Sequence, residues 1–123
     1  MKEEHLTEQI IGAAIEVHKH WGPGLYEEIY ERSMCRELEL RGLAFDCQVS
    51  LPLEYKGAIV GEDLRLDLWV QKKVIIEVKS VAALLPIHEA QLLTYMKLTK
   101  SQVGLLINFN VAVLKKGLKR LVL

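Results

Sequence analysis

Apolar positions follow two different periods along the chain, and each period predicts one kind of element. They recur every three or four residues over about 5–20, 26–41 and 87–99, which predicts three helices. Short apolar runs rich in β-branched residues predict strands near 44–54, 58–69, 73–79 and 103–108, and a last strand or strand pair over 111–123. The helix between the runs VIIEVKS and VGLLINF is long enough to link two parallel strands. The pattern therefore predicts an α/β (α+β) fold with one mixed four- to five-stranded sheet flanked by helices.

The composition is that of a compact globular chain. Its 123 residues are half hydrophobic and carry no net charge, which favours a single domain over 1–123 with one core. No apolar run approaches the roughly 20 residues that span a membrane, and the acidic start MKEEHLTEQI is unlike a secretory signal. Cys35 and Cys47 are expected to be reduced core thiols, because they fall in a predicted helix and a predicted strand. We therefore expect a cytoplasmic protein without a membrane segment.

The candidate chemistry starts at the strand pair LRLDLWV (64–70) and VIIEVKS (74–80), joined by the polar turn QKK. Side chains two apart on a strand share a face, so Glu77 and Lys79 point the same way, and Asp67 can reach that face from the other strand. Two carboxylates in an apolar hairpin are costly to desolvate unless something neutralises them. Oxygen ligands suit Mg²⁺ or Mn²⁺, which leaves Lys79 free to act on a water or a phosphate oxygen.

A simpler reading of the same hairpin is a solvated edge. Strands that end in Glu-x-Lys are common, and a surface ion pair contributes less than about 1 kcal/mol. On the hairpin alone this reading is favoured, so the case for a site depends on the flanking helices.

The helix predicted after Gly22-Pro23-Gly24 carries Glu27 and Tyr30, which are three apart and share a face. Acids at a helix N-terminus also have a purely electrostatic reason to be there, and Glu28 is equally well placed for it. This helix by itself does not say which glutamate is functional.

The helix that Pro86 opens places Gln91 and Tyr95 on one face, four residues apart, beside Leu92 and Met96 on a neighbouring face. Taken singly, Tyr95 is more readily explained as a core residue with its hydroxyl at the surface. His88 lies in the first turn, where it can approach the same site, although a hydrogen bond at the helix start is the preferred role.

The order of these parts resembles the PD-(D/E)xK nuclease superfamily, in particular its small bacterial GxxExxY family. The segment GLYEEIY (24–30) reproduces that motif, LRLDLWV and IIEVKS supply the acidic residues and the lysine, and HEAQLLTYMKLT is similar to the Gln-xxx-Tyr helix of the recombination-exonuclease branch. The resemblance runs from about residue 6 to 123. It implies a restriction-endonuclease-like core.

The resemblance also implies roles for individual residues. Asp67 and Glu77 would bind Mg²⁺ or Mn²⁺, together with the backbone carbonyl of Val78, and Glu27 would complete the site directly or through water. Lys79 would orient or deprotonate the attacking water or stabilise charge on the phosphate, and Gln91 and Tyr95 would hold the lysine or a substrate phosphate.

Charge is unevenly distributed along the neutral chain. After Glu89 there is no acidic residue, while lysines and an arginine continue to the end. If this half flanks the acidic cluster, it offers a rim for phosphates; the equally weighted alternative is lysines that protect an exposed strand edge. On this ground Lys97, Lys115 and Lys116 are expected to contact the substrate. Tyr30 and His88, on the two helices that flank the hairpin, are expected to contact it as well.

Three functions of different classes remain open at this point. The leading one is a Mg²⁺-dependent nuclease that hydrolyses phosphodiester bonds, in DNA rather than RNA. The second is a metal- or phosphate-binding module with little turnover, in which a homo-oligomer or a partner protein completes the function. The third is an interaction protein, with a homodimer through apolar surface around Ile10, Ala14 and Val17 as its commonest form.

Overall fold

The computed structural model describes residues 3–123, apart from the side chains of residues 62 and 63. Its elements are α1 (Glu4–Trp21), α2 (Glu27–Leu40), β1 (Phe45–Tyr55), β2 (Ala58–Val70), β3 (Val74–Lys79), α3 (Pro86–Thr99), β4 (Val103–Asn108), the 3₁₀ turn η1 (Leu114–Gly117) and β5 (Leu118–Val122). The helices and strands predicted up to residue 108 are present within one or two residues, whereas the segment 111–123, predicted as a strand or strand pair, forms η1 and the single shorter strand β5. None of the helices in the described part of the chain has both the length and the apolar character needed to cross a membrane.

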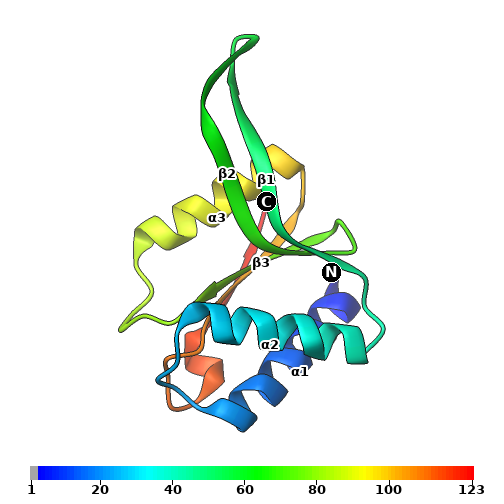
Figure 1. Cartoon of the computed structure of the whole chain (residues 1–123), viewed down its shortest axis with the longest axis vertical. Coiled ribbons are helices and arrows are strands. Elements are labelled where there is room, and N and C mark those ends of the chain that lie inside the picture. Colours follow the sequence, from blue (N-terminus) through cyan, green and yellow to red (C-terminus); the bar gives the residue numbers. More distant parts are fainter. Residues whose placement is uncertain (1–2) are drawn as a thin grey trace.

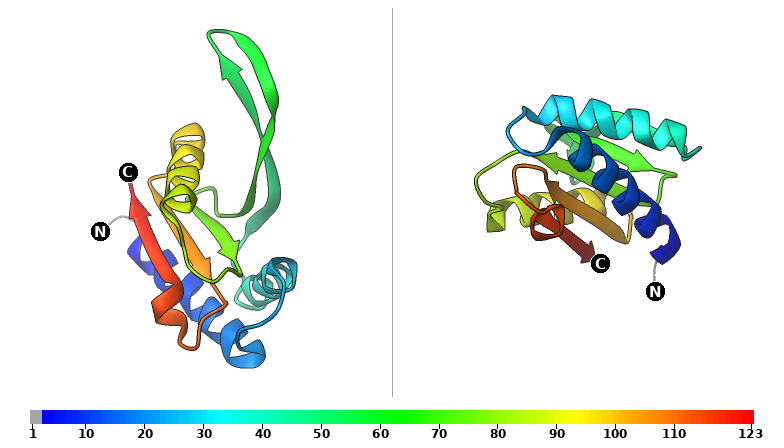
Figure 2. Two further views of the ribbon diagram at one scale, coloured as in Figure 1. Left: turned by 90° about the vertical axis from the view of Figure 1, so that its left-hand side faces the viewer. Right: turned by 90° about the horizontal axis from the view of Figure 1, so that it is seen from below.

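The five strands form one mixed sheet in the order in which they occur in the chain. The pair β3–β4 is parallel, and the other three neighbouring pairs are antiparallel. Helix α3 makes the connection between the two parallel strands, as the sequence predicts. Helices α1 and α2 cover one face of the sheet and α3 covers the other (Figures 1 and 2). The predicted mixed sheet flanked by helices, a restriction-endonuclease-like arrangement, is confirmed.

The core consists of two apolar clusters separated by the sheet. The larger lies between the sheet and α1 and α2, and the smaller contains Leu92 and Met96 of α3 with Leu66, Ile75 and Leu106. All six residues of β4 are buried, because both of its faces are covered. This explains why VGLLINF reads as a continuous apolar run.

Some predicted faces need correction. Ile10, Ala14 and Val17 are at most 4% exposed, so the homodimer interface suggested for these residues is wrong: they form the core against the sheet. Ile15 next to them is 40% exposed, because it lies about 100° around the helix from Ala14. Cys47 is exposed rather than in the core, although both cysteines are free thiols as expected.

Strands β1 and β2 extend well beyond the rest of the sheet as a two-stranded arm (Figure 1). They pair along almost their whole length, whereas β2 pairs with β3 only through Leu68, Trp69 and Val70. Strand β2 therefore leaves β3 at Asp67. This point of separation positions the candidate site.

The close packing of α3 on β4 leaves no room for a side chain at Gly104. A Cβ atom there would lie 2.7 Å from Met96 Sδ and 2.9 Å from Leu92 Cδ1, both fully buried. We expect Gly104→Ala to lower the free energy of unfolding by about 1–3 kcal/mol in urea denaturation, because the helix must move away from the sheet. The control is Gly12→Ala in α1, whose Cβ would meet only the mobile end of Arg41 and which should be neutral or stabilising. Equal stability of the two variants would contradict this packing.

Candidate active site

The site is built where β2 separates from β3, and two carboxylates replace the missing backbone pairing. The Asp67 N–H donates to Glu77 Oε2 at 2.9 Å, and the Val78 N–H donates to Asp67 Oδ2 at 2.8 Å. Each carboxylate is thus fixed by the backbone of the opposite strand. Both side chains are oriented by the fold itself.

Burial leaves these carboxylates short of compensating charge. Glu77 is only 6% exposed, and burial followed by the nearby Asp67 charge raises its pKa to about 8. Burial also raises the pKa of Asp67. The Lys79 ammonium lies close enough to oppose both of these shifts. The structure therefore brings together Asp67, Glu77 and Lys79, as the hairpin predicts.

Glu27 reaches this end of β3 through the loop that follows Lys79. The Ser80 hydroxyl donates to the Leu25 carbonyl at 2.6 Å, and the Ser80 N–H donates to Glu27 Oε1 at 3.4 Å. The same loop is fixed on its other side by buried Asn108, which donates to the Val81 carbonyl at 3.0 Å and accepts from the Val81 N–H at 3.1 Å. The start of α2 and the end of β3 are consequently held together.

Tyr30 supports the turn before α2 from within the core and does not contact a substrate. It is fully buried and stacks on Phe109, with ring centroids 4.7 Å apart and planes at 7°. Its hydroxyl donates to the Gly22 carbonyl and accepts from the Leu25 N–H at 3.2 Å. The substrate contact expected of Tyr30 is therefore wrong, because the ring and the hydroxyl are both occupied in fixing the turn before α2.

Helix α3, on the face of the sheet opposite to α1 and α2, carries the predicted site residues Tyr95, Gln91 and His88. Tyr95 is half-buried, and burial together with the negative charges of Glu77 and Asp67 raises the pKa of its hydroxyl. Gln91 lies exposed one turn earlier on the helix. His88 Nδ1 accepts a hydrogen bond from the Leu85 N–H at 3.0 Å, which is the helix-start role preferred for it.

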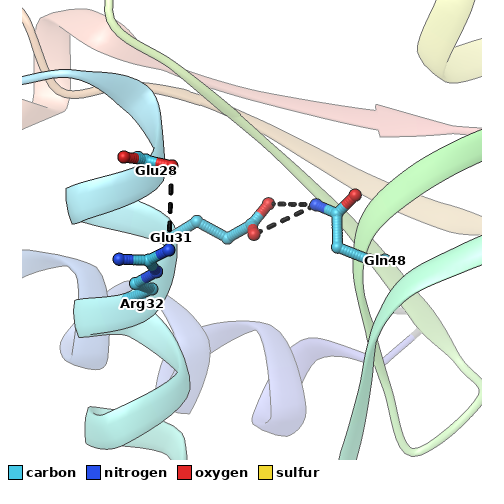
Figure 3. A network of polar contacts seen from close by, with 4 residues as sticks. All are labelled: Glu28, Glu31, Arg32 and Gln48. Carbon is cyan, nitrogen blue, oxygen red and sulfur yellow. Dashed lines mark hydrogen bonds and ion pairs between the residues drawn. The ribbon is translucent and has the colours of Figure 1, made fainter.

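Sequence reasoning missed Glu31 and Gln48. Glu31 lies four residues after Glu27 on α2, and it lines the same hollow as Asp67. Gln48 Nε2 in β1 donates to both oxygens of Glu31, at 2.8 and 3.0 Å (Figure 3). Burial and the Asp67 charge raise the pKa of Glu31 to about 7. The spacing from Glu27 is the one signal that could have found Glu31.

A hollow of about 540 Å³ opens between α2 and the base of the β1–β2 arm. Its lining is mostly acidic and polar, and consists of Glu27, Glu28, Glu31, Arg32, Cys35, Cys47, Gln48 and Asp67. Arg32 faces Glu28 at 3.8 Å on the exposed side of α2 (Figure 3). The hollow thus gives access to Asp67 from solvent, with an excess of negative charge.

The basic residues assigned to the substrate occupy different places. Lys115 and Lys116 are exposed on η1, which packs against β4 and α1. The turn η1 follows the C-terminal end of β4, where Asn108 pairs with Lys79. Lys97 is in the last turn of α3, and the chain enters β4 from there at the opposite end of the sheet from Lys79. Lys97 is therefore not placed to share a phosphate with Lys79.

Among the described residues, no three or more His, Cys, Asp or Glu side chains are arranged to hold a metal ion. The carboxylates instead turn toward backbone amides and toward each other. In kind the donors nevertheless fit a hard divalent cation, because Asp67, Glu77, Glu27 and Glu31 offer only oxygen atoms. The upward pKa shifts also show that burial disfavours the ionised form of Glu31, Asp67 and Glu77, and a bound cation would favour that form.

Comparison with protein families gives one match, to the model described as PD-(D/E)XK nuclease superfamily, over residues 4–121. The chain belongs to the PD-(D/E)XK nuclease superfamily. Searches of the curated proteins and of the solved structures found no match. Membership in the PD-(D/E)XK superfamily agrees with the mixed sheet and with the acidic strand ends described above.

The raised pKa values predict how stability depends on pH in the chelator-treated protein. Between about pH 4.5 and 8 the folded state keeps protons on Glu77 that the unfolded chain releases, so the free energy of unfolding should fall as pH rises. Glu77→Gln carries no titrating carboxyl there and should flatten this decline. We would compare melting temperatures of both proteins in EDTA from pH 5 to 8.5. Parallel curves, or a wild-type protein that gains stability relative to the variant over this range, would contradict the assignment.

Proposed function

We propose that this PD-(D/E)XK protein is a nuclease that hydrolyses phosphodiester bonds with Mg²⁺ or Mn²⁺. Enzymes of this superfamily generally use divalent metals, and a nuclease must bind nucleic acid. The observation that carries the proposal is the convergence of Asp67, Glu77 and Lys79 at the point where β2 leaves β3. A surface ion pair does not explain it, because Glu77 is almost fully buried and is fixed by the opposite backbone.

Each residue has a role that its position allows. Asp67 and Glu77 would hold the cation, and Glu27 would complete its shell from the start of α2. The bound cation would supply charge to polarise the phosphate and to favour ionisation of the attacking water. Lys79, beside both carboxylates, would orient that water or donate to a phosphate oxygen as negative charge builds there. Tyr95 and Gln91 would hold the lysine or a phosphate from the α3 side.

The finer assignment is to the GxxExxY family, with DNA rather than RNA as substrate. The segment Gly24–Leu25–Tyr26–Glu27–Glu28–Ile29–Tyr30 supports it, because the turn, the acid and the buried tyrosine act together in this fold. Tyr30 fixes the turn, and the turn presents Glu27 to the end of β3. The two free cysteines are consistent with the reducing cytoplasmic setting that we also propose.

Cleavage of labelled single- and double-stranded DNA and RNA tests the proposal. With Mg²⁺ or Mn²⁺ we expect the wild-type protein to cleave, and EDTA to abolish cleavage. Lys79→Ala should lower kcat at least about 100-fold, because a donor aimed at developing charge is lost. Lys73→Ala is the matched control, since Lys73 is exposed in the turn at the other end of β3.

A folded wild-type protein that leaves all four substrates intact would count against the nuclease. Metal binding without turnover would then favour the binding module. Equal activity of Lys79→Ala and Lys73→Ala would remove the lysine from the mechanism.

A further inference from the structure

Gln48 has an unusual backbone in the middle of β1. Its φ is 50°, and among the described residues it is the one non-glycine inside a strand with a positive φ. The residues on either side pair regularly, Cys47 with Leu68 and Val49 with Leu66, but Gln48 and Asp67 between them form no registered pair. Left-handed backbone at a residue with a Cβ costs conformational free energy, and such strain concentrates at functional sites.

The strained backbone brings the Gln48 side chain to α2. Its amide nitrogen donates to both oxygens of Glu31, at 2.8 and 3.0 Å, which anchors the end of the Glu31 side chain (Figure 3). Glu31 and Asp67 line the same hollow as Gln48, close enough for each to affect the pKa of the other, and Asp67 Oδ2 accepts from the Val78 N–H. Asp67 is therefore bonded to the β3 backbone on one side, and the hydrogen-bonded pair Gln48–Glu31 lies beside it in the hollow.

Electrostatics alone gives no reason for this arrangement. Glu31 is half-buried beside Asp67, with Glu27 also near, and like charges at close range oppose folding. Among the residues that the structure describes, Glu31 forms no ion pair with a lysine or arginine. A stabilising link between β1 and α2 could be made without placing a second carboxylate against the first.

We propose that Gln48 and Glu31 are a positioning pair for the metal site: Gln48 orients Glu31, and Glu31 orients the Asp67 carboxylate for the cation. This inference rests on the proposed metal-dependent function and adds two residues that the PD-(D/E)xK resemblance does not supply. Partners that orient metal ligands typically change metal affinity 10- to 100-fold when they are removed.

The test is Mn²⁺ affinity of the full chain by isothermal titration calorimetry, with Mn²⁺-dependent cleavage measured alongside. Gln48→Gly removes the amide and relieves the positive φ, so its melting temperature in EDTA should equal or exceed that of the wild type. We expect the same variant to bind Mn²⁺ at least about 10-fold more weakly. A merely structural link would give the opposite pattern, with lost stability and unchanged affinity.

Gln71→Gly is a closely matched control. Gln71 is also an exposed glutamine with a left-handed backbone, φ 51°, but it lies in the turn between β2 and β3, away from the acidic cluster. Its variant should keep wild-type Mn²⁺ affinity. In a Glu31→Ala background, Gln48→Gly should cause no further loss, because Gln48 acts through Glu31.

Wild-type Mn²⁺ affinity in Gln48→Gly, or full additivity of the two substitutions, would overturn the positioning pair while leaving the nuclease intact. A wild-type protein that neither binds Mn²⁺ nor cleaves would overturn the proposed function, and the pair with it. Loss of Mn²⁺ affinity in Gln48→Gly without loss of stability, and none in Gln71→Gly, is the result that supports the inference.

Discussion

The reciprocal hydrogen bonds between Asp67 and the β3 backbone and side chain are the interaction on which the site depends. They occur at the position where β2 stops pairing with β3, so two carboxylates take the place of an ordinary strand ladder. Unpaired buried backbone amides are costly, and here the acids satisfy them. The local geometry of the sheet and the placement of the acids are thus one feature. A change in either would alter the other.

Around this point the fold collects groups from distant parts of the chain. The loop after Lys79 is bonded to the turn before α2 through Ser80 and to the end of β4 through Asn108. Tyr30 stacks beneath the turn on Phe109, which directly follows β4. The position of α2 relative to β3 is therefore fixed by polar contacts as well as by apolar packing. This precision suits a site that needs Glu27 and Asp67 at fixed positions.

The electrostatic character of the site follows from its burial. Glu31, Asp67 and Glu77 all have raised pKa values for the same first cause, the loss of solvent; Lys79 offsets part of the shift for Asp67 and Glu77, and Gln48 offsets part of it for Glu31. A protein could reach this fold with apolar residues at these positions at less electrostatic cost. One buried acid, Glu77, and two half-buried acids, Asp67 and Glu31, thus lie in the region of one lysine, an arrangement that a bound cation would stabilise. Nucleases of the PD-(D/E)XK superfamily, to which the chain belongs, generally use divalent metals, which would offset this electrostatic cost.

The sequence by itself determined the elements, their order and the nucleus of the site. Periodicity sets helices and strands locally, and Asp67, Glu77 and Lys79 are close in sequence, so a hairpin is enough to bring them together. The motif around Glu27 was visible in the sequence through resemblance.

Only the tertiary structure decided which glutamates of α2 face the acids and what Tyr30 does. Glu31 meets Asp67 because α2 packs across the sheet at one angle, and Gln48 reaches Glu31 because the β1 backbone turns left-handed at one residue. Tyr30 is buried by Phe109, nearly eighty residues later, which no local pattern encodes. Local propensity fixes the parts, whereas side-chain contacts between remote segments fix the site.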